Sequence, residues 1–212
     1  VTEYRNGLAN GYATLGALQH VTGQVDQSLK ALQRASSELE QLVRDHPTVG
    51  VYQLNLVRQS HQVAEAHVRL GQLAEAIAVY GVTRDHLDRL VRDQPDVPEY
   101  EFELAKSYWK LGEAYSVNAE RAEAAQSFRR TIGILEKLLG DYSDRASFYN
   151  LLGWYLATCP DRQFHDGPRA VDLANRSIEL SPKVANFLNT LGVAQYRPGR
   201  WQDAVDSLER SI

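Results

Sequence analysis

The sequence of 212 residues contains very little sulfur: it has one cysteine, Cys159, and no methionine. A single cysteine excludes an internal disulfide framework. Because methionine is missing even at position 1, we interpret the sequence as a segment of a longer protein. No apolar run approaches the roughly 18 residues that a membrane-spanning helix needs, so we expect neither a membrane span nor a signal peptide.

The sequence also lacks a basic excess. Its 23 Lys and Arg residues are outnumbered by 27 Asp and Glu residues, which gives a formal net charge of −4. Proteins that bind nucleic acid usually carry a basic surface, so we expect no nucleic-acid partner. With 43% hydrophobic and 24% charged residues, the composition is ordinary for a folded soluble protein, and we expect a cytoplasmic one.

What the sequence does contain is an internal repeat. The segment LVRDHPTVGVYQLNLV at 42–57 recurs as LVRDQPDVPEYEFELA at 90–105, which is a step of 48 in residue number. The same step links large residues at matched positions, namely Tyr4, Tyr52, Tyr100 and Phe148. It also links a set of small residues, namely Gly23, Gly71 and Ala119. A fixed period of this size is typical of repeat architectures.

Within each repeat, apolar residues recur at the spacing of an α-helix. The third repeat has two such faces, Leu104, Tyr108, Leu111 and Tyr115, followed after a short break by Ala124, Phe128, Ile132, Leu135 and Leu139. This spacing predicts two antiparallel helices joined by a tight turn. Neither helix can bury its apolar face alone, so neighbouring repeats must stack.

Short motifs predict where these helices begin and end. The sequence DVPE at 96–99 favours a helix start, with Asp96 as the capping residue and a proline in the first turn. Pro47 and Pro95 are expected just beyond the ends of the preceding helices.

The pattern of small and large residues resembles the tetratricopeptide repeat (TPR). In NTLGVAQYRPGRWQDAVDSLERSI at 189–212, Ala204 follows Gly192 by twelve positions and the bulky Leu208 comes four further on. The resemblance implies an all-α fold, a right-handed α-solenoid of five helix-turn-helix units. We expect a single array with units at approximately 1–47, 48–95, 96–143, 144–182 and 183–212.

The first three units are longer than the TPR pattern, whose repeat has about 34 residues. Their additional segments, such as LQRASSELEQLVRDHP, do not have the composition of a linker. We therefore expect helices of about 20 residues, roughly 30 Å long, in the first three units, and shorter helices in the last two.

Two further motifs resemble the repeat tails of a group of bacterial proteins. These are the connector LVRDxPxVPEY and the loop LATCPD followed by RAVDLA. Several proteins of that group carry a protein-kinase domain before the repeats. The present sequence contains neither a Gly-rich phosphate loop nor a catalytic His-Arg-Asp motif, so we expect no kinase activity in it.

TPR arrays resemble one another in lining a concave groove with their first helices, and helical spacing then assigns the stripe that faces the groove. The stripe includes Glu65 and Glu113. The residues chosen from it as candidates for peptide binding are Arg58, His61, Lys106, Trp109, Asn150, Trp154, Asn186 and Asn189. Arg, Lys and Asn supply polar groups for a peptide backbone, and Trp supplies flat apolar area. Alternatively, Trp109 and Trp154 pack between neighbouring helices, and the polar residues are solvated.

These features predict a non-catalytic scaffold that binds a protein or peptide segment, without a cofactor or a metal. A clamp for the C-terminal carboxylates of a chaperone is excluded, because no unit has the Lys and Asn pair of that family. The alternative is self-association that positions an attached domain, such as a kinase. Homo-oligomers would form through the C-terminal repeat, whose last residues, LERSI, leave an apolar face without a polar cap.

One loop, TCPDRQFHDGP at 158–168, places Cys159, His165 and Asp166 close together in sequence. A Cys–His pair can form a nucleophile, or part of a zinc site that has too few ligands. The simpler interpretation is a turn, broken by prolines and a glycine, in which Asp166 caps the next helix. We favour the turn and expect no enzymatic activity.

Overall fold

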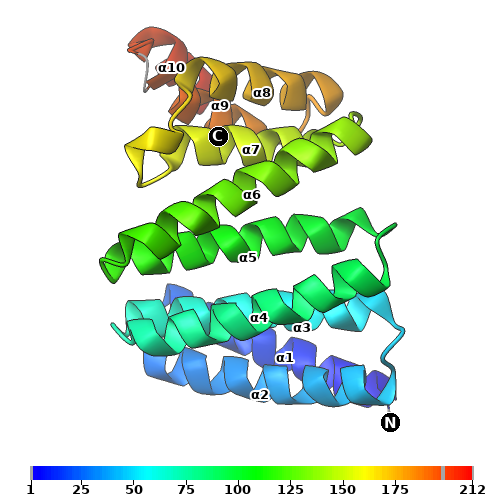
Figure 1. Ribbon diagram of the computed structural model, residues 1–212. Helices are drawn as coiled ribbons and strands as arrows, with labels where there is room; N and C mark the ends of the chain where they lie inside the picture. The colour runs from blue at the N-terminus through cyan, green and yellow to red at the C-terminus, as the bar shows by residue number, and fades with distance from the viewer. Residues whose placement is uncertain (1, 197–198, 212) are drawn as a thin grey trace. The chain divides into compact units, whose positions relative to one another are not determined.

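The computed structural model describes residues 2–196 and 199–211. These residues form ten α-helices and one short 3-10 helix, without a β-strand, so the predicted all-α fold is confirmed (Figure 1). The helices are α1 (Thr2–Val21), α2 (Val25–Asp45), α3 (Gly50–Arg69), α4 (Leu73–Asp93), α5 (Pro98–Val117), α6 (Arg121–Asp141), α7 (Ala146–Thr158), η1 (Arg162–Phe164), α8 (Gly167–Leu180), α9 (Ala185–Tyr196) and α10 (Trp201–Glu209). None of these helices is long and apolar enough to span a bilayer.

Helix lengths separate the first part of the chain from the last. Helices α1 to α6 have 20 or 21 residues, whereas α7 to α10 have 9 to 14. The step between repeats recurs in the helix starts, at Thr2, Gly50 and Pro98 for the first helices and at Val25, Leu73 and Arg121 for the second helices. The additional residues of the early repeats therefore lengthen helices, as predicted.

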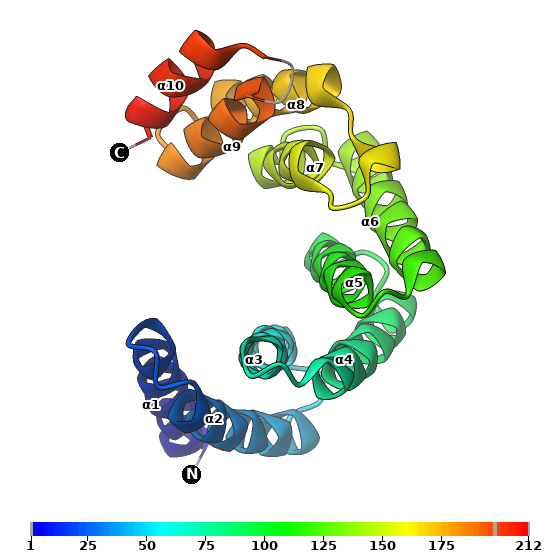
Figure 2. The same ribbon diagram turned by 90° about the vertical axis from the view of Figure 1, so that its left-hand side faces the viewer.

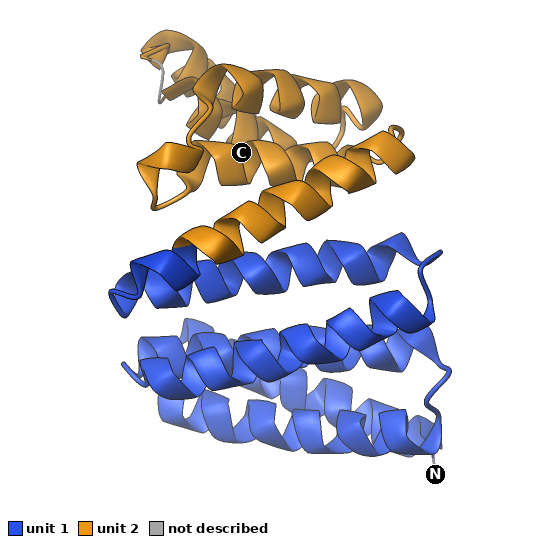
Figure 3. Cartoon of the chain, viewed as in Figure 1, with its two compact units in different colours: residues 1–124 blue, residues 125–212 orange. Residues whose placement is uncertain are grey.

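The chain divides into two compact units, residues 1–124 and 125–212 (Figure 3). In unit 1, α3 and α5 lie along one side, and α2 and α4 lie along the opposite side (Figure 2). In unit 2, α7 packs against α8 and α9, and α9 packs against α10. The division of 1–212 into a single array of five units stays a prediction.

The core of unit 1 forms where the second helix of one repeat meets the first helix of the next. The cluster between α2 and α3 contains Leu32, Val63 and Ala66. The matching cluster between α4 and α5 contains Ala76, Tyr80, Leu111 and Ala114, together with Ala64 of α3. Both clusters bury apolar side chains that neither helix could cover alone, which is why adjacent repeats stay stacked.

Small residues act at two places within the hairpins. A Cβ atom at Gly16 would lie 2.6 Å from Leu32 Cδ2, and one at Gly192 would lie 2.6 Å from Leu208 Cγ, so glycine permits the second helix to approach. In the turns, positive φ angles occur at Gly23, Gly71 and Gly199, and also at Ala119 with φ of 64°. Glycine adopts this left-handed conformation without a steric cost, whereas alanine does not.

The start of α5 differs from the prediction. The capping residue is Val97 rather than Asp96, it makes no side-chain cap hydrogen bond, and Pro98 is the first helical residue. Proline suits this position because its φ is already helical and its missing N–H needs no partner there, so the proline sets the start. Pro47 and Pro95 do follow the ends of α2 and α4, at Asp45 and Asp93, as predicted.

Candidate functional site

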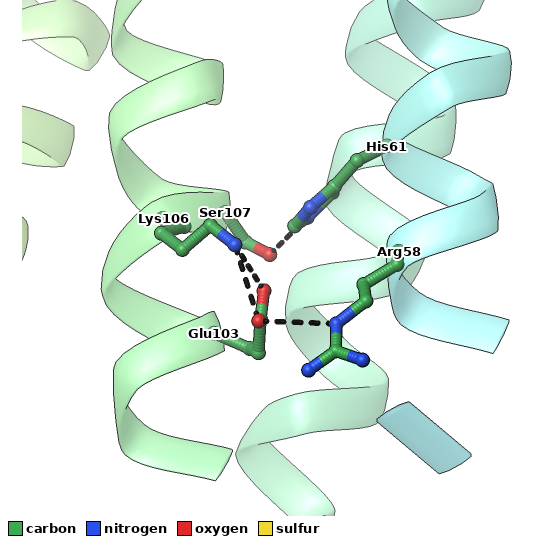
Figure 4. Close-up of polar contacts among 5 residues, drawn as sticks. All are labelled: Arg58, His61, Glu103, Lys106 and Ser107. Atoms are coloured by element: carbon green, nitrogen blue, oxygen red, sulfur yellow. Dashed lines mark hydrogen bonds and ion pairs between the residues drawn. The ribbon is translucent and has the colours of Figure 1, made fainter. Parts of the chain in front are cut away.

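The candidate site begins where α3 and α5 lie side by side in unit 1 (Figure 4). Glu103 of α5 is buried, and its carboxylate lies 2.9 Å from Nζ of Lys106 and 3.7 Å from Nε of Arg58. Arg58 is exposed and Lys106 is half-buried. The structure therefore brings the predicted Arg58 and Lys106 together across two helices, through a carboxylate that was not among the predicted residues.

His61 lies one turn after Arg58 but is buried between the helices. Its Nε2 is 2.7 Å from Oγ of Ser107, and its ring is tilted against Tyr80 with centroids 6.0 Å apart. Burial, followed by the charges of Lys106 and Lys110, lowers the pKa of His61 to about 3, so the imidazole is neutral at neutral pH. His61 is thus a contact between helices, and the prediction that it faces a bound peptide is corrected.

Trp109 is also placed differently from the predicted groove position. Only 3% of its surface is exposed, so the indole offers no flat area to a ligand. The alternative interpretation, burial among helices, describes Trp109 correctly. Large aromatic side chains gain more from burial than from exposure on a helix surface.

Next to this network, unit 1 contains a cleft of about 280 Å³. The cleft is lined by His20 of α1, Glu65, Val68 and Arg69 of α3, Tyr80 of α4, and Lys110, Glu113, Ala114 and Val117 of α5. Lys110 bridges two carboxylates, with its Nζ 3.0 Å from Glu65 and 3.4 Å from Glu113. Arg69 donates a hydrogen bond to the backbone carbonyl of His20 at 3.0 Å, which ties α3 to the end of α1.

The charges in the cleft are fixed by these contacts. Burial lowers the pKa of Lys110, but Glu113 and Glu65 more than offset this effect, so the pKa lies above its usual value and the ammonium stays charged. Burial, followed by Glu65 and Glu113, raises the pKa of the Tyr80 hydroxyl, which stays neutral. The cleft therefore combines ordered donors and acceptors with an apolar surface from valine and alanine.

The other four predicted residues lie on α7 and α9 in unit 2. Asn150 is buried, and its Oδ1 has no hydrogen-bond partner among the described residues. Trp154 and Asn189 are half-buried, and Asn186 is exposed. Three of the four side chains thus keep surface that a partner can reach.

The loop after α7 has the structure of a turn. His165 Nε2 donates a hydrogen bond to the backbone carbonyl of Cys159 at 2.5 Å, and Cys159 is buried. Asp166 caps α8, since its carboxylate accepts a hydrogen bond from the backbone N–H of Arg169 at 3.1 Å, as predicted. In the described part of the chain, no three His, Cys, Asp or Glu side chains gather closely enough to hold a metal ion.

Sequence reasoning missed several site residues that carry charge. Glu103 was not predicted, although it lies three residues before Lys106 and so on the same helix face. Lys110 was also missed, although its spacing of three residues to Glu113 indicates an ion pair on one helix face. Glu65 and Glu113 were placed on the predicted stripe but were not selected as binding residues.

Comparison with known proteins identifies the fold. No protein-family model matches the sequence, and no curated protein matches it significantly. The crystal structure of TTC0263, a thermophilic TPR protein of Thermus thermophilus, matches with a TM-score of 0.59 at 15% identity, over 96% of this chain and 89% of that chain. The TPR-like repeats of a putative kinesin light chain from Podosopora anserina match with a TM-score of 0.53 at 20% identity, over 98% and 94%. The chain thus has the fold of the TPR proteins.

Proposed function

We propose that this chain is a non-catalytic protein-interaction scaffold, and that unit 1 binds an extended segment of a partner protein at the cleft between α3 and α5. The proposal is carried by one observation, an open cleft whose charged groups are held in place beside an apolar surface. The TPR fold supports this class of function, because stacked helix pairs present extended surfaces that suit protein partners.

The chemistry of the cleft suits a peptide. An apolar side chain of the partner packs on Val68, Ala114 and Val117. Backbone carbonyl groups of the same segment accept hydrogen bonds from Lys110 and Arg69. A volume of about 280 Å³ lies just below the range of small-molecule sites, roughly 300–1,000 Å³, and fits a single side chain better than a cofactor.

The ion pairs reduce the conformational entropy that these side chains lose when a peptide binds. Lys110 is held between Glu65 and Glu113, and Lys106 is held by Glu103. Side chains that are already ordered lose little freedom when a peptide binds. Arg58 and Lys106 continue the polar row on the same two helices. In unit 2, the proposed contacts are the three predicted residues that keep exposed surface, Trp154, Asn186 and Asn189.

The cleft can be tested with a displayed library of random peptides selected on the 212-residue chain. Val117→Lys places a charge on the apolar side of the cleft, and Val82→Lys is the matched control on α4, outside the cleft. A selected peptide should bind the Val82→Lys variant as it binds the wild type, and bind the Val117→Lys variant at least about 10-fold more weakly. Equal affinity for the Val117→Lys variant, or a loss confined to the Val82→Lys variant, would place the binding site elsewhere.

A further inference from the structure

Two exposed apolar patches lie outside the cleft. The head patch, on α1, consists of Leu15 and Leu18, which are 45% and 62% exposed. The tail patch, on α10, consists of Trp201 and Val205, which are 59% and 47% exposed, together with the half-buried Leu208. Single exposed apolar residues are ordinary. These two groups, however, occupy the repeat positions that form the two sides of the interfaces between repeats in unit 1.

The head patch has the register of an interface that occurs twice inside unit 1. Leu15 corresponds, one and two repeats later, to Val63 of α3 and Leu111 of α5, and Leu18 corresponds to Ala66 and Ala114. All four counterparts are buried, and they pack against the second helix of the preceding repeat, which is α2 for α3 and α4 for α5. The head patch is therefore the surface on which this fold receives a second helix.

The tail patch has the register of that second helix, because the α9–α10 hairpin repeats the α1–α2 hairpin, with Gly192 and Gly199 in the places of Gly16 and Gly23. The turn glycines have φ of 80° at Gly23 and 85° at Gly199. The residues before the second helices have φ and ψ of −85° and 61° at Gln24 and of −84° and 62° at Arg200. Leu208 also meets Gly192 as Leu32 meets Gly16.

Because the two hairpins share a register, each residue of the tail patch corresponds to a residue of α2 whose contacts the structure shows. Trp201, Val205 and Leu208 take the places of Val25, Leu29 and Leu32. In unit 1 these three residues of α2 form the apolar surface that contacts Val63 and Ala66 of α3. The tail patch is thus the surface that this fold presents to a following first helix.

We propose that a second copy of the chain docks its tail patch on the head patch, so that copies join head to tail in the geometry of the α2–α3 interface. The contact is heterologous, because the two surfaces differ, and each copy keeps one patch open for another copy. It does not depend on the peptide-binding cleft.

The composition of α1 supports this occupant. Residues 6–19 contain no charged side chain, so no charge within this stretch has to be desolvated when an apolar surface docks on α1. Leu18 is also larger than the alanines at its counterparts Ala66 and Ala114, which increases the apolar area available to a docking helix. At the edge of the tail patch, Arg200 and Asp203 pair at 2.7 Å, so no unpaired charge from this pair opposes docking.

Sedimentation velocity over a roughly hundredfold range of concentration tests the proposal, because association by mass action depends on concentration. The wild type and the control Val82→Lys should increase in mass with concentration. Leu18→Lys blocks the head patch and Val205→Lys blocks the tail patch, and each variant alone should stay monomeric. An equimolar mixture of the two should form a dimer and nothing larger, because one intact head patch and one intact tail patch remain.

Other outcomes would overturn the head-to-tail contact. Association of the Val205→Lys variant alone would indicate a head-to-head dimer, and association of the Leu18→Lys variant alone would indicate a tail-to-tail dimer. A wild type that is monomeric at every concentration would contradict any self-association through these patches. Circular dichroism verifies that the variants are folded, and Leu15→Lys is a second head variant. Peptide binding at the cleft should be unchanged in all of them, which separates this proposal from the proposed function.

Discussion

His61 links the stability of unit 1 to pH. Its pKa of about 3 in the folded state lies below the ordinary value of 6.5, so between these values the unfolded chain binds a proton that the folded chain does not. Stability therefore rises with pH across this window and falls as the solution is acidified. From pH 7 to pH 5, we expect His61 to lower the free energy of unfolding by about 2 kcal/mol.

Urea unfolding of the wild type and of His61→Gln, at both pH values, measures this contribution. Glutamine can still hydrogen-bond to Ser107 but does not titrate, so the variant should lose less stability between pH 7 and pH 5. Burial, followed by Arg89, also lowers the pKa of His86, and the variant should therefore keep some pH dependence of the same sign. Equal losses in the wild type and the variant would contradict the linkage to His61.

Glu103 makes the ion-pair network sensitive to the loss of one partner. Lys106→Met removes the closer cation and leaves the buried carboxylate with Arg58 at 3.7 Å. Removing one partner of a fully buried pair costs roughly 3–5 kcal/mol. Because Lys106 is half-buried, we expect a smaller loss of about 2 kcal/mol.

Glu103→Gln provides the second arm of the double-mutant cycle. In the Lys106→Met background it removes the unpaired charge and should restore about 1 kcal/mol, as measured by urea unfolding. If Glu103→Gln destabilised the wild type and the Lys106→Met variant equally, the two residues would be energetically independent despite their distance of 2.9 Å.

At the scale of the helices, Ala119 is the weak point of the hairpin turns in unit 1. It adopts φ of 64°, where the equivalent turns have Gly23 and Gly71. Left-handed backbone costs a non-glycine residue roughly 1–2 kcal/mol, and replacing alanine with glycine relieves this strain. Glycine also has greater conformational freedom in the unfolded chain, which offsets part of the stabilisation. Ala119→Gly should therefore stabilise the protein by about 0.5–1 kcal/mol, measured as a higher urea midpoint.

Gly71→Ala is the reciprocal variant. It introduces the same strain into the α3–α4 turn and should destabilise the protein by about 1 kcal/mol. The two substitutions should thus change stability in opposite directions. A destabilising Ala119→Gly would show that helix propensity, rather than the turn conformation, controls this position.

The helices could be predicted from sequence because their signals are local. Apolar spacing of three and four residues and the fixed step between repeats define the helix pairs without knowledge of the neighbouring chain. The start of α5 was predicted one residue too early, because the Asp96 side chain makes no cap and Pro98 sets the first turn.

The burial of each site residue could not be predicted from local spacing. Arg58 and His61 belong to the same predicted stripe on α3, yet Arg58 is exposed while His61 is buried against Ser107 of α5. Helical spacing gives the direction of a side chain but not the distance to the next helix. Trp109 was misplaced for the same reason. The spacing to Lys106 placed Glu103 on the same helix face, but its burial and its contact with Arg58 depend on how closely α3 and α5 pack.

For the molecule as a whole, the two units offer a peptide different surfaces. The open cleft with ordered ion pairs lies in unit 1, whereas unit 2 offers half-buried or exposed side chains on α7 and α9. Binding energy is usually concentrated in a few well-packed contacts. We therefore expect unit 1 to dominate the affinity for a peptide selected on the cleft.

Two matched pairs of substitutions test this expectation by isothermal titration. Arg58→Ala with Lys106→Ala alters the polar row beside the cleft, and Asn186→Ala with Asn189→Ala alters the proposed contacts in unit 2. The first pair should weaken the selected peptide at least about 10-fold, and the second pair should weaken it less than about 3-fold. The reverse order would move the main binding surface to α7 and α9. Equal losses would indicate that the peptide contacts both units, and a quadruple variant would then lose affinity by the product of the two effects if the contacts are independent.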